Sequence, residues 1–341
     1  MDSPPAEGDR PVSAALTGAT GFLGGVLLGR LLADGQTVRV LVRREADARR
    51  LEALRAACVV GDLTDPGGCR GLVGRGDVVY HAAARVDMVG SWDDFHRTTV
   101  QGTRHLLDAA LEQGPARFVY VSSAGVYPTE APRGGFCADR TAADPPRCNL
   151  YGRAKLAAEQ LVRRECERAG CPWTIVRLGF LYGPGNEALY HRLRPLLERG
   201  QLRVIGAGDN RIAACYIDDA AEAVRLAGMH PSAAGRVYDV ANDESVTQRQ
   251  FLDAMADVLE LPRPTGRVPR WLATGGAVAS ELLARLPGVK PALTRAMVAL
   301  MAADKVLDSG AIRRELDWRP EVDFAQGVRR THEARHTAAG A

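Results

Sequence analysis

Several common sequence features are missing from this chain of 341 residues, and each absence argues against a class of protein. The seven cysteines are odd in number and include no C-x-x-C pair, which argues against a disulfide framework and predicts no metal site. The net charge is only +3 and both signs are dispersed, so there is no basic stripe for nucleic acid. Lysine is scarce, with three residues among 44 Lys and Arg, at positions 155, 290 and 305.

Segments that would target or anchor the chain are also missing. Residues 1–10 are polar, contain proline and lack an apolar stretch, so we expect a disordered leader, no signal peptide and a cytoplasmic location. The most apolar late run, Trp271 to Leu286, is interrupted by Glu281 and Arg285 and is too short to span a bilayer. A buried or interfacial helix is favoured there over membrane contact, and no transmembrane segment is expected.

A glycine-rich stretch, L-T-G-A-T-G-F-L-G-G-V, runs from Leu16 to Val26 between an apolar run and a helical pattern. Gly18, Gly21 and Gly24 recur in it every three residues. Such glycines permit a tight turn, let backbone N–H groups approach a pyrophosphate, and let a helix pack closely on a strand. The stretch predicts a dinucleotide site. The alternative is an ordinary glycine-rich loop in a chain that has 36 glycines.

Apolar runs typical of strands alternate with helical patterns through position 180. We expect strands at 12–16, 38–42, 58–60, 78–81, 118–122 and 174–178, and helices at 26–32, 45–54, 92–112 and 151–169. This alternation predicts an α/β Rossmann fold, a doubly wound parallel sheet with right-handed helical crossovers. We assign residues 11–183 to this dinucleotide-binding domain. Mainly helical pieces then predict a smaller substrate lobe, residues 184–335, with a strand near 237–240 returning to the main sheet.

The choice of cofactor depends on the residues that end the second and third strands. Arg43 lies nineteen residues after Gly24, where a carboxylate would hold the ribose 2′-hydroxyl of NAD and a guanidinium favours the 2′-phosphate of NADP. We therefore predict NADP(H), with NAD as the alternative; a merely solvated arginine would also fit. Asp62 could accept a hydrogen bond from the adenine amino group, or it could be a turn residue or helix N-cap.

The fourth strand ends in H-A-A-A, residues 81 to 84. The small side chains of Ala82 and Ala83 would let a cofactor lie against the backbone. His81 is expected to be structural.

The reacting groups are expected at the fifth strand and the helix that follows. Ser123 ends the strand, and Y-G-R-A-K, Tyr151 to Lys155, starts the helix with Tyr and Lys one turn apart on the same face. An unperturbed tyrosine has a pKa of about 10, and lowering it toward 7 requires about 4 kcal/mol. The Lys155 ammonium and an oxidised nicotinamide could supply this stabilisation, while Ser123 orients the substrate oxygen.

Seven motifs together resemble the extended short-chain dehydrogenase/reductase family, also called the NAD-dependent epimerase/dehydratase family, over nearly the whole chain: T-G-A-T-G-F-L-G, G-D-L-T-D, H-A-A-A, V-S-S-A-G-V-Y, Y-G-R-A-K, L-Y-G-P-G and Y-I-D-D-A-A. The resemblance implies an NAD(P)-dependent oxidoreductase with Ser123, Tyr151 and Lys155 as catalytic residues, and a homodimer. It also implies a set of cofactor-binding residues: Gly18, Thr20, Gly21, Phe22, Leu23, Gly24, Arg43, Asp62, Leu63, Ala82, Ala83 and Lys155.

The chain departs from the family pattern at two places. Thr99 replaces the asparagine of Asn-Val-x-Gly-Thr, and Arg177-Leu178-Gly179 stands where many members have Arg-Pro. Neither change affects the catalytic set. Ser123-Ala124-Gly125 lacks the Thr-Asp-Glu acids of sugar-nucleotide dehydratases, which argues against water elimination.

Within the family, two branches compete. The segment from Ala84 to His96 and the run P-A-L-T-R-A-M-V-A-L-M resemble the 3β-hydroxysteroid dehydrogenase-like branch, which includes 2-alkyl-3-oxoalkanoate reductases. This implies interconversion of a ketone and a secondary alcohol on a hydrophobic small molecule. The alternative is a nucleotide-sugar epimerase with tightly held NAD(P), in which Arg211, seven residues before Asp218, would hold the diphosphate. A non-catalytic NADP-binding regulator is a third alternative.

Overall fold

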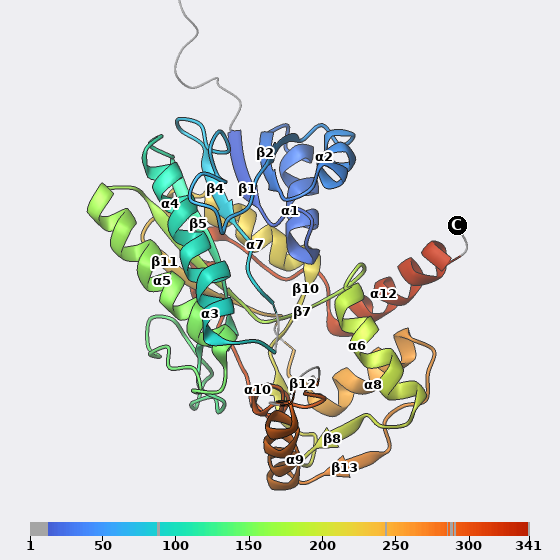
Figure 1. Cartoon of the computed structure of the whole chain (residues 1–341). Coiled ribbons are helices and arrows are strands. Elements are labelled where there is room, and N and C mark those ends of the chain that lie inside the picture. The colour runs from blue at the N-terminus through green and yellow to red at the C-terminus, as the bar shows by residue number, and fades with distance from the viewer. Residues whose placement is uncertain are drawn as a thin grey trace, which may run out of the picture.

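The computed structural model describes residues 13–86, 89–242, 244–284, 286, 289 and 291–339 (Figure 1). The expected leader, residues 1–10, lies outside the described residues. The main feature is a seven-stranded parallel sheet in the order β11-β6-β5-β4-β1-β2-β3. Its strands are β1 (Ser13–Thr17), β2 (Thr37–Val42), β3 (Ala57–Val60), β4 (Val78–His81), β5 (Arg117–Ser123), β6 (Trp173–Leu178) and β11 (Arg236–Val240). The predicted doubly wound α/β fold is confirmed, with the strand order reversing between β1 and β4.

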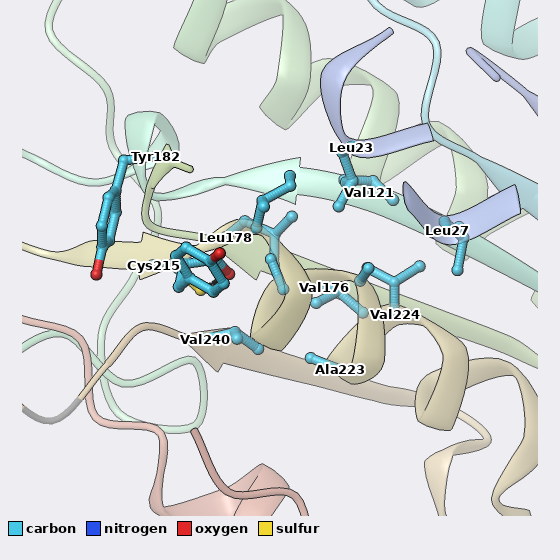
Figure 2. Close-up of a cluster of buried hydrophobic side chains, with 14 of the residues drawn as sticks. Leu23, Leu27, Val121, Val176, Leu178, Tyr182, Cys215, Ala223, Val224 and Val240 are labelled. Atoms are coloured by element: carbon cyan, nitrogen blue, oxygen red, sulfur yellow. Dashed lines mark hydrogen bonds between the residues drawn. The ribbon is translucent and has the colours of Figure 1, made fainter. Parts of the chain in front are cut away.

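Helices cover both faces of this sheet, because alternate residues of each strand point to opposite sides. Phe118 and Tyr120 of β5 pack with α4 (Gly102–Leu111) and α5 (Leu150–Ala169). Val119 and Val121 pack on the opposite side, in the core formed with α1 (Phe22–Ala33), α2 (Glu45–Glu52) and α7 (Ile217–Met229). Figure 2 shows side chains of α1 and α7 meeting the strand residues of this second core.

The expected helix 92–112 is interrupted. It consists of α3 (Trp92–Phe95), a π-helical segment (His96–Gln101) and α4. Ser91 caps the start of α3 by accepting a hydrogen bond from the Asp94 backbone, at an Oγ–N distance of 3.2 Å. Segments of π-helix often occur at functional sites, and this one contains Thr99, one of the two departures from the family pattern.

The second half of the chain is mainly helical, with short paired strands that the sequence does not predict. Its other helices are α6 (Glu187–Glu198), α8 (Gln248–Val258), α9 (Arg270–Leu283), α10 (Arg295–Met301), α11 (Gly310–Leu316) and α12 (Phe324–Ala339). The short pairs are β7 (Phe180–Tyr182) with β10 (Ala214–Tyr216), β9 (Arg211–Ile212) with β12 (Val246–Thr247), and β8 (Arg203–Ile205) with β13 (Gly266–Val268). Strands of two or three residues are too short to show an alternating pattern.

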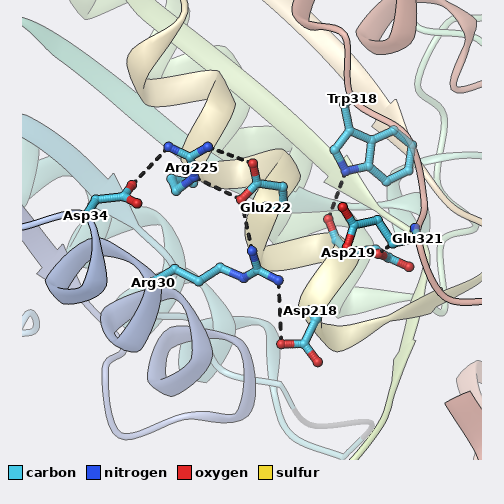
Figure 3. A network of polar contacts seen from close by, with 8 residues as sticks. All are labelled: Arg30, Asp34, Asp218, Asp219, Glu222, Arg225, Trp318 and Glu321. Atoms are coloured by element: carbon cyan, nitrogen blue, oxygen red, sulfur yellow. Dashed lines mark hydrogen bonds and ion pairs between the residues drawn. The ribbon is translucent and has the colours of Figure 1, made fainter.

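The second half of the chain also completes the main sheet and its covering layer. β11 pairs in parallel with β6, and α7 packs against α1. Figure 3 shows the polar side of the α1–α7 contact, where Arg30 of α1 donates to Glu222 of α7 at 3.0 Å. The indole Nε1 of Trp318 donates to the main-chain oxygen of Asp219 at 3.0 Å, which fastens the segment before α12 to α7.

The apolar helix α9 lies at the surface. Among its residues only Ala273 and Ala277 are buried, whereas Trp271 is 74% exposed and Leu283 is 59% exposed. The two alanines form the edge that packs beside Val298 of α10, and the large side chains lie outside that edge. Of the two alternatives expected for this segment, a buried helix is therefore wrong, and an interfacial helix stays a prediction. Within the described ranges, no helix is both long and apolar enough to cross a membrane.

Candidate active site

The turn between β1 and α1 is shaped by close backbone contacts that only glycine permits. Gly18 has a φ of +84°, and a Cβ there would lie 2.8 Å from the backbone nitrogen of Ala83. A Cβ on Gly24 would lie 2.0 Å from the Gly18 oxygen. The turn is closed by the Gly21 N–H, which donates to that same oxygen at 2.9 Å. These contacts place the start of α1 directly over the end of β1.

The start of α1 has the properties of an anion site. Gly21 is the N-cap residue, so no side chain caps the first N–H groups, and the first turn contains no acidic residue. Thr20 and Gly21 are exposed and Phe22 is half-buried, so all three border the open side of the turn. Leu23 is buried in the core, which leaves only its backbone to face a ligand. The residues present therefore fit the pyrophosphate of a dinucleotide.

The remaining candidate cofactor residues lie at the carboxyl ends of neighbouring strands. Arg43 is exposed just after β2. Asp62 follows β3, and its Oδ1 accepts hydrogen bonds from the backbone nitrogen and the hydroxyl of Thr64 at 2.8 and 2.9 Å, which makes it a turn residue. Leu63 is half-buried, and its backbone oxygen is 2.7 Å from Nδ1 of His105.

A buried hydrogen-bond chain starts beside Ala82 and Ala83, which follow β4. The Ala83 N–H donates to Thr17 Oγ1 at 3.3 Å, and that hydroxyl is 2.7 Å from His81 Nδ1. His81 Nε2 is 2.9 Å from Thr103 Oγ1, which itself donates to the Thr99 oxygen at 2.6 Å. The Thr103 hydroxyl has one hydrogen, which it donates to Thr99, so it accepts a hydrogen bond from His81 Nε2. Nε2 is therefore the ring nitrogen that carries the hydrogen. Burial, together with the Lys155 charge, lowers the pKa of His81 to about 3, so the ring is neutral.

Ser123 and Tyr151 are brought together by the loop after β5 and the start of α5. Both side chains border Gly125, since a Cβ on that glycine would lie 3.4 Å from Ser123 Oγ and 3.5 Å from two ring carbons of Tyr151. The N-cap residue of α5, Asn149, accepts from the Gly152 N–H and donates to the Gly125 oxygen, both at 2.9 Å. A Cβ on Gly152 would lie 2.1 Å from that Gly125 oxygen. Asn149, which sequence reasoning missed, therefore connects the start of α5, which carries Tyr151, to the loop that follows Ser123.

Lys155 lies one turn after Tyr151 and is buried. Its Nζ donates to the Val121 oxygen at 2.6 Å and lies 4.7 Å from the centre of the Tyr120 ring. Burial lowers its pKa to about 7, although the nearby Glu159 carboxylate acts in the opposite direction.

The pKa of Tyr151 is raised in the chain alone, because burial penalises the phenolate more than the Ser123 hydrogen bond stabilises it. The sequence-based expectation of a lowered pKa therefore does not hold for the protein without its cofactor. The positive nicotinamide included in that expectation is not part of the protein.

A buried charge array lies behind the lysine. Arg177 forms two hydrogen bonds to Glu159 at 3.0 and 2.6 Å, and donates to the Tyr127 hydroxyl at 2.8 Å. Tyr127 in turn donates to Asp239 of β11, at 2.9 Å for the shorter contact. Burial raises the pKa of Asp239 to about 7. Because Glu159 follows Lys155 by one turn of α5, the array fixes the helix that carries both catalytic candidates.

A second lysine, Lys305, binds the backbone of the loop that follows Ser123. The half-buried Lys305 donates from Nζ to the backbone oxygens of Ala124, at 3.3 Å, Tyr127, at 2.9 Å, and Pro128. These three bonds use all three ammonium hydrogens. Burial lowers the pKa of Lys305 to about 8. Sequence reasoning counted this lysine but gave it no role.

The structure gives physical settings for both departures from the family pattern. Thr99 contributes its main-chain oxygen to the His81 chain, while its hydroxyl is buried and has no partner among the described residues. At the second departure, Leu178 completes β6, pairing with Ser123 and Val240. The next residue, Gly179, passes so close to the backbone of Ala213 that a Cβ would lie 2.1 Å from its oxygen.

Two observations bear on the substrate. A small cavity beside Tyr151 is bordered by Phe95, Cys148 and Ala296, the last from α10. Arg211, considered above as a diphosphate ligand, instead donates from Nε to Asp304 Oδ1 at 2.9 Å and from Nη2 to Oδ2 at 2.5 Å.

The chain is similar to known proteins over most of its length. The model of the NAD dependent epimerase/dehydratase family matches residues 14–241. The chain is 30% identical over 323 residues to a 2-alkyl-3-oxoalkanoate reductase of Stenotrophomonas maltophilia (strain K279a), covering 92% of this chain and 97% of that one. It is 29% identical over 329 residues to the 4-hydroxy-2-methyl-3-oxo-4-farnesyl-3,4-dihydroquinoline-1-oxide ketoreductase of Stigmatella aurantiaca, covering 96% and 97%.

Solved structures show the same fold. The UDP-glucose 4-epimerase of Thermus thermophilus, in complex with NAD, superposes with a TM-score of 0.71 at 23% identity, over 96% of this chain and all of that one.

Proposed function

The chain belongs to the NAD dependent epimerase/dehydratase family of extended short-chain dehydrogenases/reductases, which are NAD(P)-dependent enzymes, and from this premise we propose that it is an NADPH-dependent ketoreductase. The substrate is a hydrophobic small molecule with a ketone that is reduced to a secondary alcohol. The observation that carries the proposal is the placement of Ser123 and Tyr151 beside the same glycine, Gly125, with Lys155 one turn away, at the carboxyl edge of the sheet where the glycine turn also lies.

Each catalytic side chain has a distinct task. NADPH, when bound, would supply the hydride. Ser123 holds the ketone oxygen, and Tyr151 gives that oxygen its proton. Because burial raises the pKa of Tyr151, the phenol is protonated at neutral pH, which is the form that reduction requires. Lys155 binds the nicotinamide ribose and contributes positive charge near the phenol when it is protonated.

The cofactor residues are proposed on the fit of the glycine turn. Gly18, Gly21 and Gly24 would let the start of α1 meet the pyrophosphate. Arg43 supports NADPH over NADH because its exposed guanidinium could form charge-assisted bonds to a 2′-phosphate. Asp62 would use the carboxylate oxygen that Thr64 leaves open to reach the adenine.

The reductase is favoured over the nucleotide-sugar epimerase by the environment of two residues. Arg211 is held by both oxygens of Asp304, so its guanidinium is engaged within the protein rather than presented to a diphosphate. Among the residues that border the small cavity beside Tyr151, Phe95, Leu150 and Ala296 are apolar, which is compatible with a hydrophobic substrate. Both relatives named above are reductases by their names, and one of them acts on a farnesyl compound.

A cofactor assay tests the proposal. Purified protein is mixed with NADPH and a panel of long-chain β-keto compounds and cyclic ketones, with UDP- and dTDP-sugars in parallel, and the reduced-nicotinamide absorbance is followed. The expected result is stoichiometric loss of NADPH with a hydrophobic ketone and no change in the sugars. Conversion of a nucleotide sugar without net loss of NADPH would instead establish the epimerase. NADPH binding without conversion in either panel would favour the regulator.

A further inference from the structure

Three side chains of metal-ligand type, from α12 and from the residue that follows α8 by two positions, converge at the surface. Figure 1 shows the positions of the two helices. His332 and His336 lie one turn apart on α12, and their Nε2 atoms are 3.1 Å apart. The Oε1 atom of Glu260, just past α8, lies 2.8 Å from Nε2 of His336 and 3.5 Å from Nε2 of His332. The three atoms thus form a triangle whose members come from two separate helical regions.

The sides of this triangle are close to, or somewhat shorter than, the ligand separations around a coordinated ion. Zinc binds imidazole nitrogen and carboxylate oxygen at about 2.0–2.2 Å, and a tetrahedral arrangement then separates the ligand atoms by roughly 3.3–3.5 Å. Of the observed separations, 3.5 Å falls in that range, whereas 3.1 and 2.8 Å are shorter than its lower end by about 0.2 and 0.5 Å. Small side-chain rotations at this exposed site would suffice to admit the ion.

Hydrogen bonding alone does not satisfy this arrangement. An imidazole nitrogen has one hydrogen or one lone pair in the ring plane, so Nε2 of His336 can serve either Glu260 or His332. Yet it lies within hydrogen-bond distance of both. A single cation at the centre of the triangle would engage all three atoms at once.

The surrounding charges leave the triangle available to a cation. Within the described part of the chain, the ion pairs of Glu260 involve only the two histidines. The nearest arginine on the same helix, Arg335, is directed to Glu187 and lies over the Tyr190 ring. Glu260, His332 and His336 are 62%, 40% and 54% exposed at their side chains, so an ion can enter from solvent.

We propose that Glu260, His332 and His336 form a binding site for a divalent transition metal of the zinc class, with water completing the coordination. Two imidazoles and one carboxylate suit Zn²⁺, Co²⁺, Ni²⁺ and Cu²⁺, whereas Mg²⁺ and Ca²⁺ prefer all-oxygen sites. The cysteine pattern does not predict such a site, because its ligands are an H-x-x-x-H pair and a glutamate distant in sequence.

The role of the metal is structural. Glu260 is held by the turn that ends α8, in which the Leu261 N–H donates to the Ala256 oxygen at 3.0 Å. The metal would therefore connect a fixed point on α8 to the last turns of α12. The beginning of α12 is already anchored, since the Phe324 ring packs 6.1 Å from that of Phe251 of α8. The site contains none of the catalytic candidates, so it is expected to affect stability rather than turnover.

Metal titration of the whole chain, purified without a histidine tag, tests the proposal. Isothermal calorimetry with ZnCl₂ is expected to give one site per chain in the micromolar range. His336→Gln and Glu260→Gln should each weaken binding at least tenfold, whereas His191→Gln, an exposed histidine of α6, should not. Saturating Zn²⁺ should raise the melting temperature by on the order of 5 °C at a hundredfold excess over Kd, and Mg²⁺ should not.

Cobalt provides an independent readout, because visible absorption of bound Co²⁺ reports its ligand geometry. A spectrum typical of tetrahedral coordination that disappears in both variants would support the site. Zinc binding that is unchanged in His336→Gln and Glu260→Gln, or no binding below 1 mM, would overturn it.

Discussion

The closest backbone contact of the glycine turn gives the sharpest structural prediction, which concerns Gly24→Ala. The new Cβ would lie 2.0 Å from the Gly18 oxygen, 2.5 Å from the Gly18 carbonyl carbon and 3.0 Å from the Ala19 nitrogen. All three are backbone atoms, so no side-chain rotation relieves the overlap. Either α1 or the turn must move by about 1.5 Å to restore ordinary van der Waals separation.

The size of the effect follows from two opposing terms. Overpacking a close contact costs about 1–3 kcal/mol, and a rigid backbone neighbour favours the upper end. Replacing a helical glycine with alanine stabilises the folded state by about 0.5–1 kcal/mol. We expect a net loss of about 2 kcal/mol and a melting temperature lower by roughly 4–8 °C. Because the Gly21 N–H bonds to the displaced Gly18 oxygen, affinity for NADP⁺ should also fall, by about tenfold or more.

Gly25→Ala is the matched control. Its Cβ would lie 3.5 Å from the Ala19 oxygen, an ordinary contact, in the same turn of the same helix, where Gly25 is exposed and Gly24 is buried. This variant should melt at the wild-type temperature or a few degrees above it and should bind cofactor normally. Thermal unfolding by circular dichroism and cofactor titration by fluorescence measure both variants. If Gly24→Ala melts within 1 °C of wild type and binds NADP⁺ equally well, the close-approach argument is refuted.

Four further outcomes are expected. Tyr151→Phe should bind NADPH normally while turnover falls by about 10²–10⁴-fold in steady-state assays, and undiminished turnover would exclude the tyrosine as the proton donor. Arg43→Ala should remove a roughly ten- to hundredfold preference for NADPH over NADH, measured by fluorescence titration; an unchanged ratio would show that the arginine does not read the 2′-phosphate. Burial lowers the pKa of Lys155 to about 7, so its ammonium is lost as the pH rises above 7. The affinity for NADPH should therefore fall by up to about tenfold per pH unit in binding titrations. The same fall of affinity with pH in Lys155→Met would contradict this assignment. Arg177→Met leaves Glu159 buried without its cation and should destabilise the fold by about 3–5 kcal/mol in denaturant unfolding. Adding Glu159→Met should restore part of the lost stability. An Arg177→Met variant as stable as wild type would mean that the ion pair is dispensable.

The main sheet could be predicted because its central strands, such as β4 and β6, are buried on both faces and are mostly apolar. The expected strand 78–81 coincides with β4, and that at 174–178 differs from β6 by one residue. The short strands could not be predicted, since two or three residues give no pattern. The exposure of α9 could not be predicted from the sequence either, because an apolar composition does not show whether a neighbouring element covers the helix.

In the candidate site, local spacing was informative and long-range contacts were not. The four-residue separation of Tyr151 and Lys155 correctly places both on α5. Asn149 carries a local signal, because asparagine is a favoured N-cap residue. Lys305 offered none: its contact with Ala124 joins positions 181 residues apart in sequence. The direction of the Tyr151 pKa shift depends on how deeply the helix is buried, which sequence spacing does not encode.

The return of the late chain to the main sheet limits how this protein could be divided. β11 and α7 are encoded after Gly183, yet β11 forms an edge of the seven-stranded sheet and α7 covers it. A fragment ending at Gly183 would expose Val176, which α7 now covers, to water. Residues 11–183 therefore do not form an independent unit that could be expressed alone or joined to a different second half. New substrate preferences are more easily acquired by changing α9, α10 and the segments between them, which leave the sheet intact.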